Sequence, residues 1–197
     1  MTETNIIYSN PIAGKRKPGT VGLPLEGQSL RIVDDSLNNL DKDEIGNIQV
    51  KGPNVFNGYW NLPEKTKEDF SSDNFFNTGD KGFIDQDGYL TIVGRSKDMI
   101  ISGGLNVYPK EIESLIDDLD GVGESAVIGL KDNDLGEKVV AVVVRQDKSE
   151  ITEDELITTL KKDIAGFKVP KQVIFIDELP RNAMGKVQKN VLRDNYQ

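Results

Sequence analysis

The sequence predicts an α+β protein in two parts, a β-rich part over residues 1–94 and a small α+β part over residues 95–197. Short β-prone runs separated by Gly, Pro, Asn and Asp dominate the first part. In the second part, strands alternate with amphipathic helical patterns. The chain has 197 residues, of which 37% are hydrophobic, which is sufficient for one large or two small cores.

The β-rich part is expected to contain short strands and one short helix. Asp87-Gly88 lies between two β-prone runs and favours a hairpin. Pro63 and Glu64 are typical of a first helical turn. The expected elements are an ordered loop over 10–24, strands over 29–34 and 46–52, a helix over 62–70, and two strands within 82–95.

The α+β part is expected to alternate strands with helices. Thr152 followed by Glu155 forms a capping box that opens a helix with an apolar face. The run KVVAVVVRQ is apolar enough to be a central strand. The expected strands are 98–102, 124–130, 138–146 and 172–179, and the other expected helices are 108–119 and 187–196.

The composition excludes several classes of function. The formal net charge of −9 argues against a protein that coats nucleic acid or an anionic membrane through its overall field. The chain contains no Cys and no His, so thiolate nucleophiles, Ser-His pairs, disulfides and ordinary zinc sites are excluded. No stretch approaches the roughly 20 apolar residues of a membrane span. We expect a cytoplasmic protein whose chemistry uses Lys, Arg, carboxylates, hydroxyls and backbone amides.

The segment FFNTGDKG contains the first candidate site, Thr78-Gly79-Asp80. One interpretation is a turn in which Asp80 bonds its own backbone and Gly79 takes a positive φ. The other is a carboxylate on a rigid turn that accepts the hydroxyls of a ribose. The motif alone leaves both interpretations open.

The segment VGRSKDMIISGGLNVYP places several unusual features close together. Arg95 ends a strand, and the Lys97-Asp98 pair follows it. The adjacent Gly103 and Gly104 allow either a close approach of a ligand to the backbone or a tight strand-to-helix turn. Lys97 and Asp98 would ordinarily form a solvated charge pair that contributes little to stability.

A basic stretch near the end of this acidic chain is the third candidate. Arg181, Lys186 and Lys189 lie in a run with no acid between Glu178 and Asp194. An exposed Lys on such a loop can serve solubility. It can also act as a point charge that neutralises a phosphate in a transfer reaction.

Four segments taken in order, MTET, TGDKG, GRSKDMIISGGLNVYPKEIE and LPRNAMGKVQK, resemble the later motifs of the adenylate-forming superfamily. The resemblance covers essentially the whole chain. GTVGLPL, GYWNLPEKTKEDF and PRNAMGKVQKNVL look like the malonyl-CoA synthetase branch in particular. The resemblance implies an acid-thiol ligase that joins malonate to ATP, giving an acyl-adenylate and pyrophosphate, and then transfers the acyl group to CoA.

The resemblance also implies roles for residues that match the motifs. Thr2 matches a residue that contacts the nucleotide phosphate or the acyl group, and Glu3 matches one that helps to hold Mg²⁺. Asp80 matches the ribose-binding Asp, and Arg95 the Arg that also contacts the nucleotide sugar.

The remaining implied roles concern the α+β part. Lys97 matches the hinge on which the small domain swings between the two half-reactions. Ser102, Gly103 and Gly104 match the loop that this swing brings against the CoA pantetheine channel. Lys186 matches the catalytic Lys that bridges the carboxylate and the α-phosphate during adenylation.

Family members also carry a large N-terminal domain with a phosphate loop, which this sequence lacks. The resemblance therefore implies that residues 1–94 finish that domain, that residues 95–197 form a mobile lid, and that ATP, Mg²⁺, CoA and a small carboxylate bind to the complete enzyme. We expect the 197 residues alone to be inactive. The alternatives are a synthetase for another short carboxylic acid, an adenylation domain that loads a carrier protein, and a non-catalytic module that acts with a separate N-terminal chain.

Overall fold

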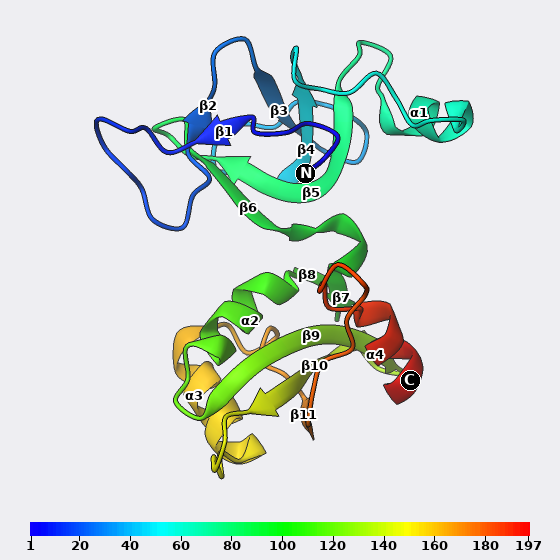
Figure 1. Ribbon diagram of the computed structural model, residues 1–197. Coiled ribbons are helices and arrows are strands. Elements are labelled where there is room, and N and C mark those ends of the chain that lie inside the picture. The colour runs from blue at the N-terminus through cyan, green and yellow to red at the C-terminus, as the bar shows by residue number, and fades with distance from the viewer. The chain divides into compact units, whose positions relative to one another are not determined.

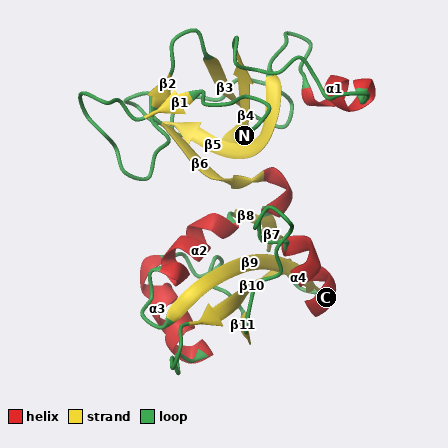
Figure 2. Ribbon diagram, in the orientation of Figure 1, coloured by secondary structure: helices red, strands yellow, loops and turns green.

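The computed structural model describes all residues, 1–197, and divides into two compact units, Met1–Lys97 and Asp98–Gln197 (Figure 1). The first unit is mostly β and the second combines strands and helices, which confirms the predicted α+β class (Figure 2). The units separate after Lys97, three residues beyond the boundary expected from the sequence. No helix is long and apolar enough to cross a lipid bilayer.

The first unit is built on a four-stranded antiparallel sheet in the order β3-β4-β5-β6. Its core contains Ile32, Ile48, Val50, Phe76 and Leu90, all nearly inaccessible to solvent. The elements of this unit are β1 (Tyr8–Ser9), β2 (Leu23–Pro24), β3 (Ser29–Val33), β4 (Gly46–Lys51), α1 (Pro63–Asp69), β5 (Phe76–Ile84) and β6 (Leu90–Arg95).

The hairpin expected around Asp87-Gly88 is present between β5 and β6. Strand pairing ends at Ile84 and Leu90, and the loop closes where the Asp85 carboxylate accepts hydrogen bonds from the amides of Asp87 and Tyr89, both at 2.9 Å. Gly88 has a φ of +88°, which glycine adopts without a steric cost. This hairpin makes the middle of β5 and the end of β6 neighbours.

The second unit has a central strand, β10, that pairs with β9 on one side and with β11 on the other. Ser102 at the end of β7 also pairs with Gly136 at the start of β10. The elements are β7 (Ile100–Ser102), β8 (Leu105–Val107), α2 (Pro109–Asp117), β9 (Val122–Asp132), β10 (Gly136–Arg145), α3 (Glu153–Asp163), β11 (Gln172–Ile176) and α4 (Lys189–Tyr196).

Helices cover both faces of this sheet. Alternate residues of a strand point to opposite faces, so Val139, Ala141 and Val143 of β10 pack in one core with residues of α2 and α3. Val140 and Val142 pack on the other face with Leu192 of α4. Both faces of β10 are therefore buried, as its continuous apolar sequence predicts.

The helix signals in the sequence predicted the positions of the observed helices closely. The Thr152 side chain accepts a hydrogen bond from the amide of Glu155, and the Glu155 side chain accepts one from the amide of Thr152, which confirms the capping box. The sequence missed β8. The chain between Gly103-Gly104 and α2 forms this short strand, so the glycines make a strand-to-strand hairpin and not a strand-to-helix turn.

Candidate functional site

The Thr78-Gly79-Asp80 motif forms a bulge inside β5. On the partner strand β4, Asn47 pairs with Lys81 and Gln49 pairs with Asn77, so three residues of β5 oppose one of β4. Gly79 has a φ of +73° within this bulge. The bulge turns the chain locally and presents Asp80 at the sheet surface.

The bulge is held by a buried hydroxyl. Thr78 Oγ1 donates to the carbonyl of Ile48 at 3.0 Å and accepts from the amide of Asp80 at 3.1 Å. The backbone of Asp80 is therefore fixed by its second neighbour in sequence. Sequence reasoning gave Thr78 no supporting role, although a Thr two residues before an Asp is a recognisable signal for such a bond.

Asp80 and Arg95 are brought together by the β5–β6 pairing. They are register partners, and Arg95 Nε lies 2.9 Å from Asp80 Oδ1. Burial raises the pKa of the Asp80 carboxyl, while the charges of Arg95 and the Met1 amino group oppose that rise. The result is a half-buried carboxylate beside a guanidinium that is 47% exposed, with donors and acceptors available for a polar ligand.

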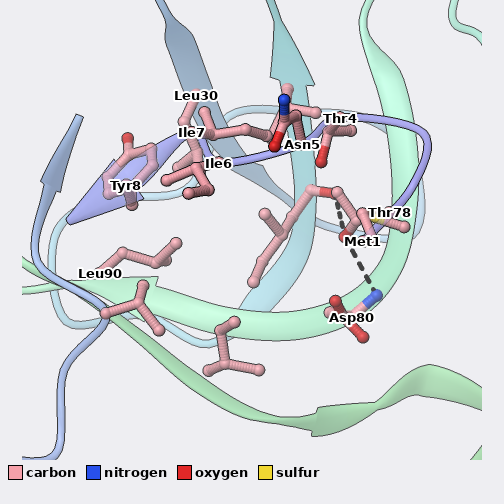
Figure 3. Close-up of a pocket in the computed structure, with 14 residues that line it drawn as sticks. Met1, Thr4, Asn5, Ile6, Ile7, Tyr8, Leu30, Thr78, Asp80 and Leu90 are labelled. Atoms are coloured by element: carbon pink, nitrogen blue, oxygen red, sulfur yellow. Dashed lines mark hydrogen bonds between the residues drawn. The ribbon is translucent and has the colours of Figure 1, made fainter. Parts of the chain in front are cut away.

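A pocket of about 280 Å³ opens beside Asp80 (Figure 3). Its walls are mostly apolar, and burial raises the pKa of the Tyr8 hydroxyl on its wall to about 12. Met1 and Thr4 line the pocket together with Thr78 and Asp80. The first residues of the chain thus run past the Asp80 carboxylate.

Thr2 and Glu3 contact each other and do not line this pocket. Thr2 Oγ1 donates to Glu3 Oε2 at 3.3 Å, and the Tyr59 hydroxyl donates to Glu3 Oε1 at 3.4 Å. The chain has no cluster of three or more acidic side chains that could hold a metal by itself. A single carboxylate such as Glu3 fits Mg²⁺ that is bound mainly through nucleotide phosphates and water.

Gly103 and Gly104 form the two-residue turn of the β7–β8 hairpin. Ser102 pairs with Leu105, and the two glycines have φ values of +58° and +78°, as a type I′ turn requires. The amide of Gly103 donates to the carbonyl of Leu135 at 2.9 Å. Ser102 is buried, so the glycine turn is the exposed part of this candidate.

Lys97 lies at the boundary between the two units, in a 3₁₀ turn over Ser96–Asp98. Its side chain is exposed. The next residue, Asp98, belongs to the second unit and accepts a hydrogen bond from Arg193 of α4 at 3.0 Å. A backbone rotation at Lys97 would leave that contact intact.

Lys186 lies on an exposed loop between β11 and α4, as expected. Its two basic neighbours have acidic partners, Arg181 with Glu124 and Lys189 with Glu113. Lys186 has none within ion-pair distance. The basic stretch near the end of the chain therefore reduces to one unpaired ammonium group.

Two family models match the chain. The model of AMP-binding enzymes matches residues 1–60, and the model of the AMP-binding enzyme C-terminal domain matches residues 111–186. Among curated relatives, malonate–CoA ligase of Arabidopsis thaliana is 43% identical over 208 residues, and long-chain-fatty-acid–CoA ligase of Salmonella typhimurium is 43% identical over 189. These alignments cover 100% and 96% of this chain. They cover 34% and 33% of the relatives, so the chain spans about a third of their length.

The solved structure of ATP-bound MatB from Rhodopseudomonas palustris matches the whole chain at 57% identity with a TM-score of 0.92, and the match covers 39% of that protein. The apo structure of the same protein matches with a TM-score of 0.76 at the same identity and coverage. One chain compared with two structures of MatB gives different scores, so those two structures differ from each other in this region.

Proposed function

Because this chain belongs to the AMP-binding enzyme family, we propose that it is the C-terminal third of an ATP-dependent acyl-CoA synthetase. In the first half-reaction, a carboxylate oxygen attacks the α-phosphorus of ATP and pyrophosphate leaves. In the second, the CoA sulfur attacks the acyl carbon and AMP leaves. The observation that carries the proposal is the unpaired ammonium of Lys186 on a tightly bonded loop, within the LPRNAMGKVQK segment that resembles the family motif.

We assign nucleotide binding to residues of the first unit. Asp80 would accept the ribose hydroxyls, which suits an ionised carboxylate held by a fixed backbone. Arg95, whose guanidinium lies against Asp80, would contact the same sugar. Thr2 would donate to a phosphate or acyl oxygen, and Glu3 would help to hold Mg²⁺ beside the phosphates.

Lys186 would act in the adenylation step. Negative charge moves between the carboxylate and the phosphate as the new P–O bond forms, and an ammonium placed at both oxygens stabilises that charge. Attack by the CoA thiol needs an open path to the acyl carbon, which requires the lysine to leave. The same side chain therefore cannot occupy the site in both half-reactions.

Lys97 would be the hinge for this exchange, with residues 1–94 finishing the large domain and residues 95–197 acting as the mobile lid. The difference between the ATP-bound and apo structures of MatB supports such a movement in a relative. The Gly103-Gly104 turn, next to Ser102, would then border the pantetheine channel of CoA. Two adjacent residues without side chains allow a narrow ligand to approach the backbone closely.

We propose malonate as the acyl substrate. The support is the likeness of the GTVGLPL and GYWNLPEKTKEDF segments to that branch, together with the malonate–CoA ligase among the relatives. A fatty-acid–CoA ligase of the same identity favours a different carboxylate as the second candidate. Comparing malonate with acetate, oxalate and a long-chain fatty acid in the complete ligase, with CoA and a carrier protein as acceptors, separates these candidates.

The test uses the complete ligase that contains these residues and measures each half-reaction. Lys186→Ala should lower malonate-dependent ATP–pyrophosphate exchange by roughly 100- to 1,000-fold. It should leave the reaction of preformed malonyl-adenylate with CoA nearly unchanged. Lys161→Ala, on the exposed side of α3, is the matched control and should change neither. Equal loss in both half-reactions, or no loss, would contradict the proposed role.

The chain alone should give no exchange, because too little of the ATP and carboxylate sites is present to position both reactants. Vigorous exchange by the 197 residues would refute the assignment of the chain as one part of a larger ligase.

A further inference from the structure

The loop that carries Lys186 is attached to β9 by one side chain. The Arg181 guanidinium forms an ion pair with Glu124 of β9, and its Nη1 donates to the carbonyl of Gly185 at 2.7 Å. Gly185 directly precedes Lys186. Arg181 therefore connects the body of the unit to the peptide that sets the direction of the lysine.

Within the loop, an isolated antiparallel bridge pairs Arg181 with Val187, and the Asn182 side chain adds hydrogen bonds of its own. Its side-chain oxygen accepts from the amides of Met184 at 2.9 Å and Lys186 at 3.0 Å. Its amide donates to the carbonyl of Lys186 at 3.0 Å. These bonds fix the loop relative to Asn182, and the adjacent Arg181 fixes this end of the loop to the sheet.

The segment beyond Lys186 is also attached to the body of the second unit. Lys189, at the start of α4, lies 2.5 Å from Glu113 of α2, and both side chains are largely buried. The Glu113 carboxylate also accepts a hydrogen bond from the amide of Val127 at 2.8 Å. The segment between Arg181 and Lys189 thus has a fixed point at each end.

Burial does not hold this loop. Residues 181–186 are all exposed, and Met184 is 77% exposed. Arg181 and Glu124 are 43% and 34% exposed, and an ion pair at such a position contributes little to overall stability. The contacts of Arg181 therefore matter for where the loop points more than for whether the unit folds.

We propose that Arg181 and Glu124 are positioning residues for Lys186, a role that rests on the proposed function of that lysine. The guanidinium holds the Gly185 carbonyl, and the Glu124 carboxylate holds the guanidinium in place. A lysine that must bridge two substrates tolerates little displacement, because misplacement by about 1 Å costs on the order of 100-fold in rate. Arg181 touches no reacting atom in this scheme.

The first measurement is amide hydrogen exchange on the 197-residue chain. Arg181→Gln should speed the exchange of the Asn182, Gly185 and Lys186 amides by roughly tenfold or more, because local opening is no longer opposed. Arg145→Gln is the matched control, since Arg145 is also exposed and donates to a backbone carbonyl, that of Ile151, at 3.0 Å. The control should leave these three amides unchanged. Unchanged loop exchange in Arg181→Gln would overturn the proposal.

The second measurement separates the half-reactions in the complete ligase. Arg181→Gln should lower kcat for adenylation by roughly 10- to 100-fold, with little change in the KM for ATP and in the attack of CoA on preformed acyl-adenylate. Arg181→Lys, which keeps the charge but loses the second donor group, should recover part of the rate. Glu124→Gln should give an intermediate loss.

Two outcomes distinguish this proposal from the proposed function. Wild-type adenylation in Arg181→Gln, with faster loop exchange, would overturn the positioning role alone. Wild-type adenylation in Lys186→Ala would overturn the proposed function of the lysine, and with it the catalytic consequence of the Arg181–Glu124 contacts. The amide hydrogen exchange result would be unaffected.

Discussion

At the scale of single residues, the partly buried carboxylate of Asp80 lowers the stability of the fold when it is ionised. Burial raises its pKa above the ordinary value of 3.8, so the folded state binds the proton more tightly than the unfolded chain does. Its contribution to stability is then most favourable below pH 3.8 and is lost as the pH rises through the folded pKa. A carboxylate whose burial disfavours its charged form is typical of a binding residue.

Two Asp-to-Asn variants of the chain should respond to pH in opposite directions. Asp80→Asn should raise the Tm at pH 7, and the gain should disappear below pH 3.8. Asp73 has its pKa lowered to about 2 by hydrogen bonds from Arg31 and Ser71, so Asp73→Asn should lower the Tm above pH 3.8 and lose this effect as the pH falls toward 2. Thermal melts between pH 2 and 7 measure both. A lower Tm for Asp80→Asn at pH 7 would contradict the first expectation.

At the scale of elements, the Gly103-Gly104 turn fixes the register of the β7–β8 hairpin. Gly103→Ala should destabilise the second unit by about 1–2 kcal/mol, because a Cβ is strained at a φ of +58°, although it would meet Leu135 Cδ2 only at an ordinary contact distance of 3.6 Å. Gly103→Asn should cost less, because Asn tolerates this conformation. Urea unfolding of the two variants measures the difference. A loss for Gly103→Asn as large as that for Gly103→Ala would contradict backbone strain as the cause.

The start of α4 depends on a buried charge pair. Glu113→Ala should destabilise the second unit by about 3 kcal/mol, because it leaves the Lys189 ammonium buried without a partner at a helix N-terminus, where positive charge is unfavourable. The double variant with Lys189→Met should recover most of the loss. Urea unfolding of both single variants and the double variant gives the coupling. A double variant as unstable as Glu113→Ala would show that the amide of Val127, and not the lysine, is what Glu113 stabilises.

At the scale of the whole molecule, each unit has a core of its own. The second unit packs two apolar clusters on the two faces of its sheet, and the first unit has one. A protein of residues 98–197 should therefore fold by itself, with dispersed amide resonances and a cooperative thermal transition. Poorly dispersed amide resonances for this protein would show that its stability depends on residues before Asp98.

The sequence predicted best where local chemistry decides the structure. The capping box at Thr152 and the apolar run of β10 each specify their element through neighbouring residues. The bulge at Thr78-Gly79-Asp80 depends on pairing with β4, thirty residues away, so the motif could be interpreted only as a turn or a site. The proximity of Asp80 and Arg95 follows from the hairpin register, and the neutralisation of Arg181 and Lys189 follows from tertiary contacts with β9 and α2.

The pairing of Arg181 and Lys189 limits how far the positive charge of this loop can act. With two of the three cations neutralised, one ammonium faces solvent in a chain of net charge −9. At physiological ionic strength, its field decays over about 8 Å, which is little more than the length of its own side chain. Lys186 therefore cannot attract anionic reactants from a distance. In the proposed function it would act on contact, on molecules that other parts of the complete enzyme have already bound, and moderate salt should change its effect very little.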